Sequence, residues 1–437
     1  MNFLHKGQRW LPFVVFSLIG LAWLPSLAGP FQFDDYNVIV NHAPVHSLAA
    51  WWQSMPGLRP LLKLTYALNW TLSPAPFGFH LLNLLLHLLN GALLLALARR
   101  TLPLASPVAL FLVALWLLHP VQTEAVTYIA GRSVTLSTTF LFAGLLVLAN
   151  ARAESPLWAA LCTAMALAVR ETAWVFPAVF ALSLWLRGAP AREVWKAVAP
   201  SLFVVVVALG IFLVEPHYRG MIDTSFSIRS PDVQLRAQTV AHGYLLGQVF
   251  SLSPNIDPDL RVPAVWTTAL AGQALVAVTG LAIALLLVLR RRSWLAGGFL
   301  WYALLLLPTN GLMPRVDMAS ERHLYAALFG LLWCGVLLLQ SVRWRAVIGT
   351  GVVLLFTVAL AIRNEDYRSE LALWARTSQQ SPGKARVWNN LGVACGLAGA
   401  PDCADEAFTR AMRLDPHDPR PAVNRHFLLH RRASSPE

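Results

Sequence analysis

The chain has 437 residues, of which 57% are hydrophobic and only 13% are charged. Soluble domains average about 25% charged residues, so this composition excludes an ordinary soluble globular protein and places most of the chain in a bilayer. The net charge of +12 does not indicate nucleic-acid binding, because in a membrane protein its meaning depends on the side that each charge occupies.

Apolar runs separated by polar loops predict an all-α, polytopic membrane protein. Several runs have roughly 18 to 25 residues, enough to cross about 30 Å of hydrocarbon, and shorter ones suit helices buried among the others. The first run resembles a signal peptide, but it is long enough to span by itself and a whole membrane domain follows it. Eleven spans are predicted, at residues 11–28, 79–98, 105–119, 133–150, 156–170, 172–187, 197–214, 265–289, 295–308, 323–341 and 346–362.

Arginine and lysine mark every second loop, which sets the predicted topology. These basic loops include Arg99 and Arg100 and the run from Arg290 to Arg292. The N-terminus is therefore expected in the cytoplasm, and the odd number of spans places the C-terminus outside. Arg outnumbers Lys 30 to 4, which favours a GC-rich, bacterial genome. The expected location is thus a bacterial inner membrane, with the C-terminal tail in the periplasm.

Acidic residues collect on the predicted outer side. Of the thirteen Asp and Glu residues before residue 363, eleven fall in outer loops or at outer span ends. Two outer loops are long: residues 29–78 contain amphipathic stretches that suit interfacial helices, and residues 215–264 contain a partly apolar segment, 240–252, expected to lie laterally or to re-enter. Such a mixed-charge face suits a polar reaction site or a head-group cavity, with ordinary loop solvation as the alternative.

The tail, residues 363–437, has no long apolar run and fits a tetratricopeptide repeat. One complete repeat is predicted at about 385–418, with half of another before it. The template positions hold Trp388, Leu391, Gly392, Ala404, Phe408, Ala411 and Pro416. About three repeats are usually needed for independent stability, so the tail is expected to rest against the membrane domain (residues 1–362) or a partner. Cys395 and Cys403 flank the turn of the repeat, where a disulfide or two packed thiols would fit.

Asp34 and Asp35 are adjacent carboxylates at the outer mouth of the first span, within the aromatic-rich stretch GPFQFDDYNV. Neighbouring side chains cannot both point the same way, so one can face a cavity while the other orients backbone or a cation. A carboxylate near the apolar boundary is partly desolvated, which raises its pKa and makes it a stronger general base. A solvated surface pair is the alternative.

Further polar groups lie at outer span ends. His119, Glu124 and Arg132 close the third span, where capping and interfacial anchoring are the alternative roles. Arg170 and Glu171 occupy a tight hairpin, where the planar guanidinium suits a phosphate unless it only extends towards the interface.

Glu321, Arg322 and His323 begin the tenth span. Glutamate is favoured at a helix N-terminus but arginine is not, so Arg322 indicates an anionic partner. No Cys/His cluster has zinc spacing and no glycine-rich phosphate loop occurs in the sequence. Nucleotide-driven transport therefore has no sequence support.

In chain order, these motifs resemble those of the TMTC (transmembrane and tetratricopeptide-repeat) family. Its members are multispanning glycosyltransferases of the C-type (GT-C) fold, related to protein O-mannosyltransferases. The matching stretches read DDY, RPLLKLTYALNW, FGFHLLNLLLH, HPVQTEAVTYIAGR, RET and ERHLY, followed by the repeat at 385–418. The chain departs from the family at Val134, where an acid is usual, and at Ala326–Ala327, where Pro-Ser is usual. These differences bear on acceptor recognition more than on the class of chemistry.

The resemblance implies transfer of a sugar, mannose in relatives, from a polyprenyl-phosphate carrier to a protein Ser/Thr hydroxyl on the outer face, with inversion. Asp34 or Asp35 would act on the acceptor hydroxyl, with a slight preference for Asp35. The residues implied in substrate binding are Arg170, Glu171, Arg322, Arg132, His119, Glu124, Glu321, His323 and Arg59. Among them, Arg170, Arg322 and Arg132 would hold the carrier phosphate, while others shape the cavity.

The implied partners are a lipid-linked sugar donor, a protein acceptor and membrane lipids, with the tail binding the acceptor or another protein. A lipid phosphate as leaving group requires no cofactor, and a divalent metal stays open. Three other functions are alternatives. A lipid-linked glycan ligase or polymerase would use the same architecture; a transporter would show inverted repeats or charges at the midplane; and a scaffold would tolerate loss of both aspartates.

Overall fold

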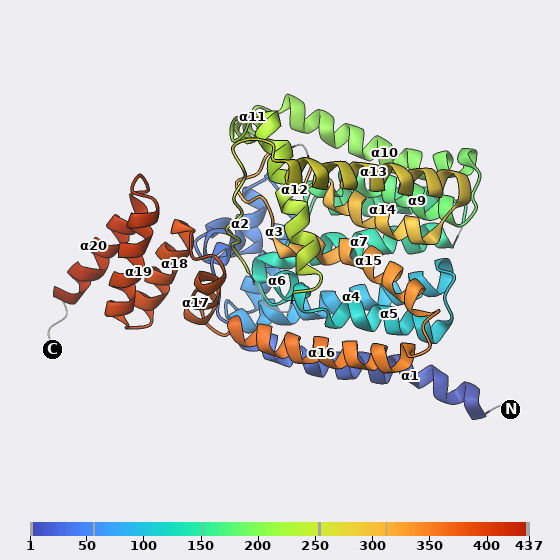
Figure 1. The fold of residues 1–437 in the computed structure, drawn as a ribbon, viewed down its shortest axis with the longest axis horizontal. Helices are drawn as coiled ribbons and strands as arrows, with labels where there is room; N and C mark the ends of the chain where they lie inside the picture. Colours follow the sequence, from blue (N-terminus) through green and yellow to red (C-terminus); the bar gives the residue numbers. More distant parts are fainter. Residues whose placement is uncertain (1–2, 56, 151, 252–254, 312, 434–437) are drawn as a thin grey trace.

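The regular elements of the protein are helices. The computed structural model describes residues 3–433 except 56, 151, 252–254 and 312. Within these residues no strand occurs, so the predicted all-α class is confirmed. The chain folds into a helical bundle with a smaller helical tail at one end (Figure 1).

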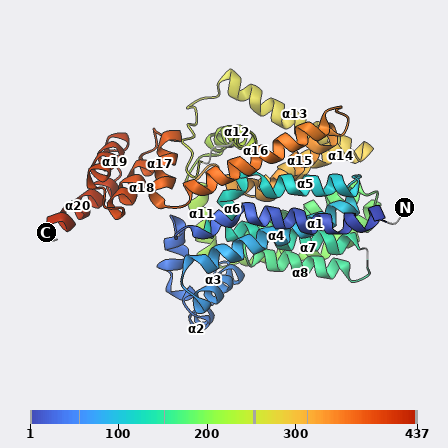
Figure 2. The ribbon, with the colours of Figure 1, turned by 90° about the horizontal axis from the view of Figure 1, so that it is seen from below.

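A helix occupies each of the predicted spans, and these helices run side by side in the bundle (Figures 1 and 2). They are α1 (Phe3–Ala22), α4 (Pro76–Thr101), α5 (Ser106–Leu118), α7 (Arg132–Ala149), α8 (Ser155–Leu167), α9 (Phe176–Leu186), α10 (Ala191–Val214), α13 (Thr268–Arg291), α14 (Trp294–Leu306), α15 (Leu324–Leu339) and α16 (Arg345–Asp366). Local signals define their ends. The Thr267 and Ser293 hydroxyls cap α13 and α14, and proline occupies the first turns of α4, α5 and α8.

Six helices in the described residues are long and apolar enough to cross a membrane, and a bent pair, Ser106–Leu118 with Pro120–Val126, could form a seventh span. Four shorter apolar helices are Trp10–Ala22, Ser155–Leu167, Glu171–Leu186 and Trp294–Leu306. The chain is thus an integral membrane protein with several apolar helices. Eleven complete crossings stay a prediction.

The connecting loops separate into two ends of the bundle. At one end, arginines of three predicted inner loops donate hydrogen bonds to neighbouring inner loops or helix ends. Arg100 donates to Asn150 Oδ1 at 2.7 Å, Arg187 donates to the Ala149 carbonyl, and Arg292 donates to the Ala189 carbonyl. The N-terminus lies towards this end and the tail lies at the opposite one (Figure 1). This separation matches the predicted alternation of loops, while the compartment that each end faces stays a prediction.

The two long loops at the tail end contain short helices. Residues 29–78 hold α2 (Leu48–Gln53) and α3 (Pro60–Leu72), and residues 215–264 hold α11 (Pro216–Ser227) and α12 (Pro231–Gln248). The α12 helix runs across the direction of the bundle helices (Figures 1 and 2). This orientation agrees with the lateral placement predicted for the partly apolar segment that begins at residue 240.

Four helices form the tail: α17 (Glu370–Gln380), α18 (Ala385–Leu397), α19 (Pro401–Leu414) and α20 (Arg420–Ala433). A Cβ atom added at Gly392 would lie 2.6 Å from the ring of Phe408, so α18 and α19 can approach this closely only with glycine there. Leu391 and Ala404 are buried in the same core, and Ala411 is also buried. These positions suit the predicted repeat, whose assignment as a tetratricopeptide repeat stays a prediction.

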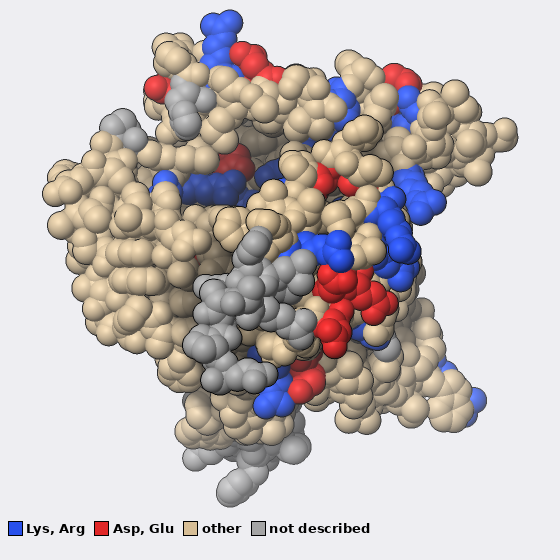
Figure 3. Space-filling model, turned by 90° about the vertical axis from the view of Figure 1, so that its left-hand side faces the viewer, with Lys and Arg blue, Asp and Glu red and all other residues tan. Residues whose placement is uncertain are grey.

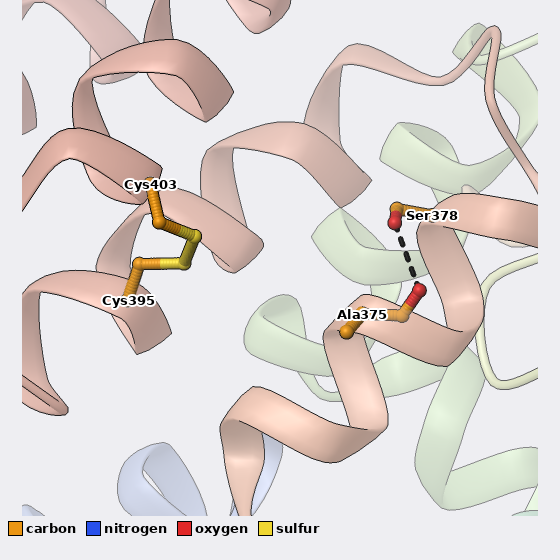
Figure 4. The surroundings of a disulfide bond; sticks show 4 residues. All are labelled: Ala375, Ser378, Cys395 and Cys403. Carbon is orange, nitrogen blue, oxygen red and sulfur yellow. Dashed lines mark hydrogen bonds between the residues drawn. A yellow bond between two sulfur atoms is a disulfide. The ribbon is translucent and has the colours of Figure 1, made fainter. Parts of the chain in front are cut away.

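A disulfide joins Cys395 of α18 to Cys403 of α19, with the Cα atoms 5.8 Å apart (Figure 4). The sequence left this pair open between a disulfide and two packed thiols. The close antiparallel packing of the two helices, which follows from the small residues between them, brings the two side chains into bonding range. Figure 4 also shows the neighbouring helix α17, where the Ser378 hydroxyl donates to the Ala375 carbonyl.

Candidate active site

Asp35 is a buried structural carboxyl. Its side chain is 1% exposed, Oδ2 accepts the Gln32 N–H at 3.0 Å, and Oδ1 accepts the Ala130 N–H at 2.8 Å. Burial raises the pKa of Asp35 to about 8, although both backbone hydrogen bonds act to lower it. Both oxygens are thus occupied: Oδ2 within the first outer loop, and Oδ1 in joining this loop to the turn before α7.

Asp34 faces the other way. Its side chain is 38% exposed and lines a cavity of about 280 Å³ at the tail end of the bundle. Its backbone N–H donates to the Tyr128 hydroxyl at 2.9 Å, which orients the residue. The alternation of adjacent side chains was predicted, but the cavity-facing member of the pair is Asp34, whereas the sequence analysis slightly preferred Asp35.

The cavity collects residues from five separate parts of the chain. Of the residues singled out from the sequence, it is lined by Asp34, Arg59, Arg170, Arg322 and His323. Figure 3 shows a hollow on the tail-end face with Lys or Arg side chains inside it. The cavity is close to the lower limit, about 300 Å³, of typical small-molecule sites.

Arg170 is a buried cation without a carboxylate bound to it. It is 6% exposed, its Nε donates to Thr172 Oγ1 at 3.2 Å, and its Nη1 donates to Ser133 Oγ at 2.9 Å. Among the described residues it makes no ion pair. Burial, followed by the nearby Arg59, lowers its pKa well below the usual range. A buried charge in this state favours an anionic ligand.

Arg322 lies between two carboxylates. Its Nη2 is 3.9 Å from Asp34 Oδ2 and its Nε is 3.5 Å from Glu124 Oε1. Glu124 is held in turn by the Ser320 hydroxyl and the Arg322 backbone N–H. The contact to Asp34 is long, so an incoming anion can compete for this guanidinium, while Glu124 keeps it in place.

Arg170, Arg322 and His323 also line a second, deeper cavity of about 50 Å³. Its other lining residues combine apolar side chains such as Leu141 and Phe176 with the hydroxyls of Ser137, Thr138, Thr172 and Thr309. Arg170, Arg322 and His323 therefore lie at the boundary between the two cavities.

The ring of His323 has a defined tautomer. Asn310 Nδ2 donates to the Met318 carbonyl at 2.8 Å, which fixes the orientation of the amide, so Asn310 Oδ1 faces His323 Nδ1 at 3.0 Å. Nδ1 must then carry the proton. Nε2 remains as a hydrogen-bond acceptor on a ring that lines both cavities.

Glu171 supports the cavity wall without lining it. Its carboxylate accepts two hydrogen bonds from Arg59, at 3.0 and 2.7 Å, and lies 4.0 Å from Arg315. This bidentate pair links α3 to the hairpin that carries Arg170.

Arg132 and His119 lie elsewhere than expected. Arg132 is 0% exposed and donates to Asn83 Oδ1, to the Phe79 carbonyl and to Thr65. Arg132 does not line the cavity, and its expected contact with the carrier phosphate stays a prediction. His119 is also fully buried and contacts the Val249 carbonyl through Nε2. Both residues fasten outer loops to the bundle.

Glu321 pairs with a residue that sequence reasoning missed. Arg363, which the sequence analysis placed at the start of the tail, forms a fully buried ion pair with Glu321 and donates to Thr123 Oγ1 at 2.9 Å. This pair fixes the short helix that carries Arg322. Arg363 directly follows the last apolar run of the chain. Its place at the outer end of a predicted span is the sequence feature that could have marked it as a candidate site residue. Arg315 and Asp317 also line the cavity and were missed.

Comparisons with known proteins agree with the motif resemblance. No family model and no solved structure matches the chain. A Caenorhabditis elegans protein, F38B6.6, is 23% identical over 439 aligned positions, covering 92% of this chain and 62% of that protein. Drosophila melanogaster Tmtc3 is 26% identical over 84% of this chain and 49% of that protein, and mouse TMTC3 is 30% identical over 30% of this chain and 16% of that protein. All three are named protein O-mannosyl-transferases. The chain spans less than two thirds of the length of each.

Proposed function

From the premise that the chain is TMTC-like, we propose that it is an integral-membrane glycosyltransferase. It would move a sugar, with mannose as the first candidate, from a polyprenyl-phosphate carrier to a Ser/Thr hydroxyl of a protein. The observation that carries this proposal is the cavity that is lined by a partly exposed carboxylate, Asp34, together with the buried guanidinium of Arg170 and the partly buried guanidinium of Arg322.

Asp34 would act as the general base. As the acceptor oxygen attacks the anomeric carbon of the sugar, its proton moves to the Asp34 carboxylate and the bond from the anomeric carbon to the phosphate oxygen breaks. Attack opposite the leaving group inverts the configuration at that carbon. The electron pair of the broken bond stays on the carrier phosphate.

Arg170 and Arg322 would bind that phosphate and stabilise the charge it gains. His323 Nε2 is placed to accept a hydrogen bond from a sugar hydroxyl. In the described part of the chain no group of three or more His, Cys, Asp or Glu side chains is arranged to hold a metal ion. We assign charge stabilisation to Arg170 and Arg322 because both line the cavity, and assays with and without EDTA test this assignment.

We place the site on the outer face of a bacterial inner membrane. The Cys395–Cys403 disulfide supports an oxidising compartment for the tail, and the basic loops at the opposite bundle end suit the cytoplasm. Accessibility of the exposed Cys403 to a membrane-impermeant thiol reagent, after reduction in sealed vesicles of known orientation, tests this assignment.

A donor screen tests the function. Purified protein is incubated with polyprenyl-phosphate sugars and a Ser/Thr-containing peptide, and both carrier release and peptide mass are measured. We expect transfer to the peptide, and a loss of about 10²- to 10⁴-fold in kcat for Asp34→Asn. Asp223→Asn, an exposed outer-loop acid, is the matched control. Extension of a lipid-linked glycan instead of the peptide would indicate a ligase or polymerase, and full activity of Asp34→Asn would refute the base assignment.

A further inference from the structure

The first turns of the tail hold the loop that carries Asp34. Gln32 Nε2 donates to the Tyr367 carbonyl at 2.6 Å, and the Phe33 N–H donates to Glu370 Oε1 at 3.0 Å. The rings of Phe33 and Trp374 meet edge to face, 5.2 Å apart. Figure 2 shows α17 directly following α16 at this end of the bundle. The residue immediately before the candidate base is thus bound by a side chain and a ring of the tail.

Phe33 needs such support because its backbone is strained. Its φ is +47°, in the left-handed region that costs a non-glycine residue about 1–2 kcal/mol, and such conformations persist only where the surroundings enforce them. Three successive N–H groups of the loop are held in different ways. That of Gln32 binds Asp35, that of Phe33 binds Glu370, and that of Asp34 binds the Tyr128 hydroxyl. Only the middle one depends on the tail.

We infer that Glu370 and Trp374 are positioning residues for Asp34, so that the tail completes the active site in addition to any role in binding an acceptor. This inference rests on the proposed function. Glu370 supplies the acceptor for the Phe33 N–H, and Trp374, which is 2% exposed, supplies a rigid surface for the Phe33 ring. Together they set the direction in which the Asp34 carboxylate points.

Residues at the start of α18 contact the loops on another side of the cavity. Arg386 forms ion pairs with Asp257 and with Asp317, and Lys384 pairs with Asp257. Asp317 lines the cavity, beside Arg315. The start of the tail therefore contacts both the loop with the candidate base and the loop opposite it.

Steady-state kinetics of the full chain test the positioning role. Glu370→Ala removes the acceptor of the Phe33 N–H, and we expect kcat to fall about 10- to 100-fold, with KM for the donor within about twofold, because Arg170 and Arg322 are untouched. Glu370→Gln keeps an acceptor oxygen and should restore most of kcat. Glu365→Ala, an exposed acid at the end of α16, is the matched control. Equal kcat for Glu370→Ala and wild type would overturn the inference.

Hydrogen exchange gives a readout that does not need activity. In Glu370→Ala and Trp374→Ala, the backbone amides of residues 31–38 should exchange faster than in wild type and Glu365→Ala, while the amides of α4 and α7 keep their protection. Unchanged exchange in both variants would overturn the inference. If wild-type protein transfers no sugar from any donor, the proposed function fails, and the exchange result alone then decides whether the tail holds this loop.

Discussion

Replacing Asp35 by asparagine should change how the stability of the protein depends on pH. Burial raises the pKa of Asp35 in the folded protein to about 8, against 3.8 for an unperturbed aspartate. A raised pKa means that folding favours the protonated carboxyl. Its contribution to stability is fully present below about pH 4 and is lost as the pH rises to about 8.

The size of the effect follows from the shift. Each pH unit between the two pKa values removes roughly 1.4 kcal/mol, so raising the pH from 5 to 8 should remove about 4 kcal/mol from the wild-type protein through this one group. Asp35→Asn does not titrate. Its amide oxygen can accept only one of the Gln32 and Ala130 N–H groups well, which costs about 1–3 kcal/mol at every pH.

The assay compares wild type and Asp35→Asn by SDS-induced unfolding in mixed micelles at pH 5, 6, 7 and 8. Wild type should be clearly more stable at pH 5, and its advantage should shrink or reverse by pH 8. Comparing the two proteins at each pH cancels the titration of all other groups, and Asp223→Asn gives the effect of removing an exposed carboxylate. A difference in unfolding free energy that stays constant across this range would refute the view of Asp35 as a buried, protonated structural carboxyl.

Three further predictions concern the arginines and the tail. Arg170→Gln should lower kcat/KM by about 10²- to 10³-fold with the fold intact, because the phosphate loses a buried donor; an effect below about threefold, measured as carrier release, would contradict the assigned role. Arg363→Met should cost about 3–5 kcal/mol, since Glu321 is left as an unpaired buried charge, and adding Glu321→Leu should recover part of that loss in the same unfolding assay. Replacing Cys395 and Cys403 by serine should destabilise the tail by about 2.5 kcal/mol, which is the chain-entropy value for two cysteines separated by 8 residues. Calorimetry with and without a reductant measures the change, and an unchanged unfolding transition of the tail would exclude a stabilising disulfide.

Much of the architecture could be predicted because membrane helices are encoded locally. Apolar run length and the alternation of basic loops were enough to locate a helix at each predicted span and to gather the outer loops at one end. The same reasoning brought Asp34, Arg59, Arg170, Arg322 and His323 to one face, and the structure brings these five around one cavity.

The direction in which each side chain points could not be predicted. Asp34 and Asp35 have the same chemistry and neighbouring positions, and only the N–H groups of Gln32 and Ala130 decide which one is turned inward. Arg132 was expected at the phosphate because it lies at an outer span end. Its partners, however, come from two other helices, α3 and α4, and periodicity does not relate their positions to it.

The way the tail is fastened bears on how such proteins could be rebuilt. Tyr367, Glu370 and Arg386 join the tail to the membrane domain by hydrogen bonds and ion pairs, whereas α19 packs against α18 and α20. A chimera joined after α18 would therefore keep every one of those bonds and exchange only the outermost helices. Activity of such a chimera towards different acceptors would then show whether the outermost helices contribute to acceptor choice.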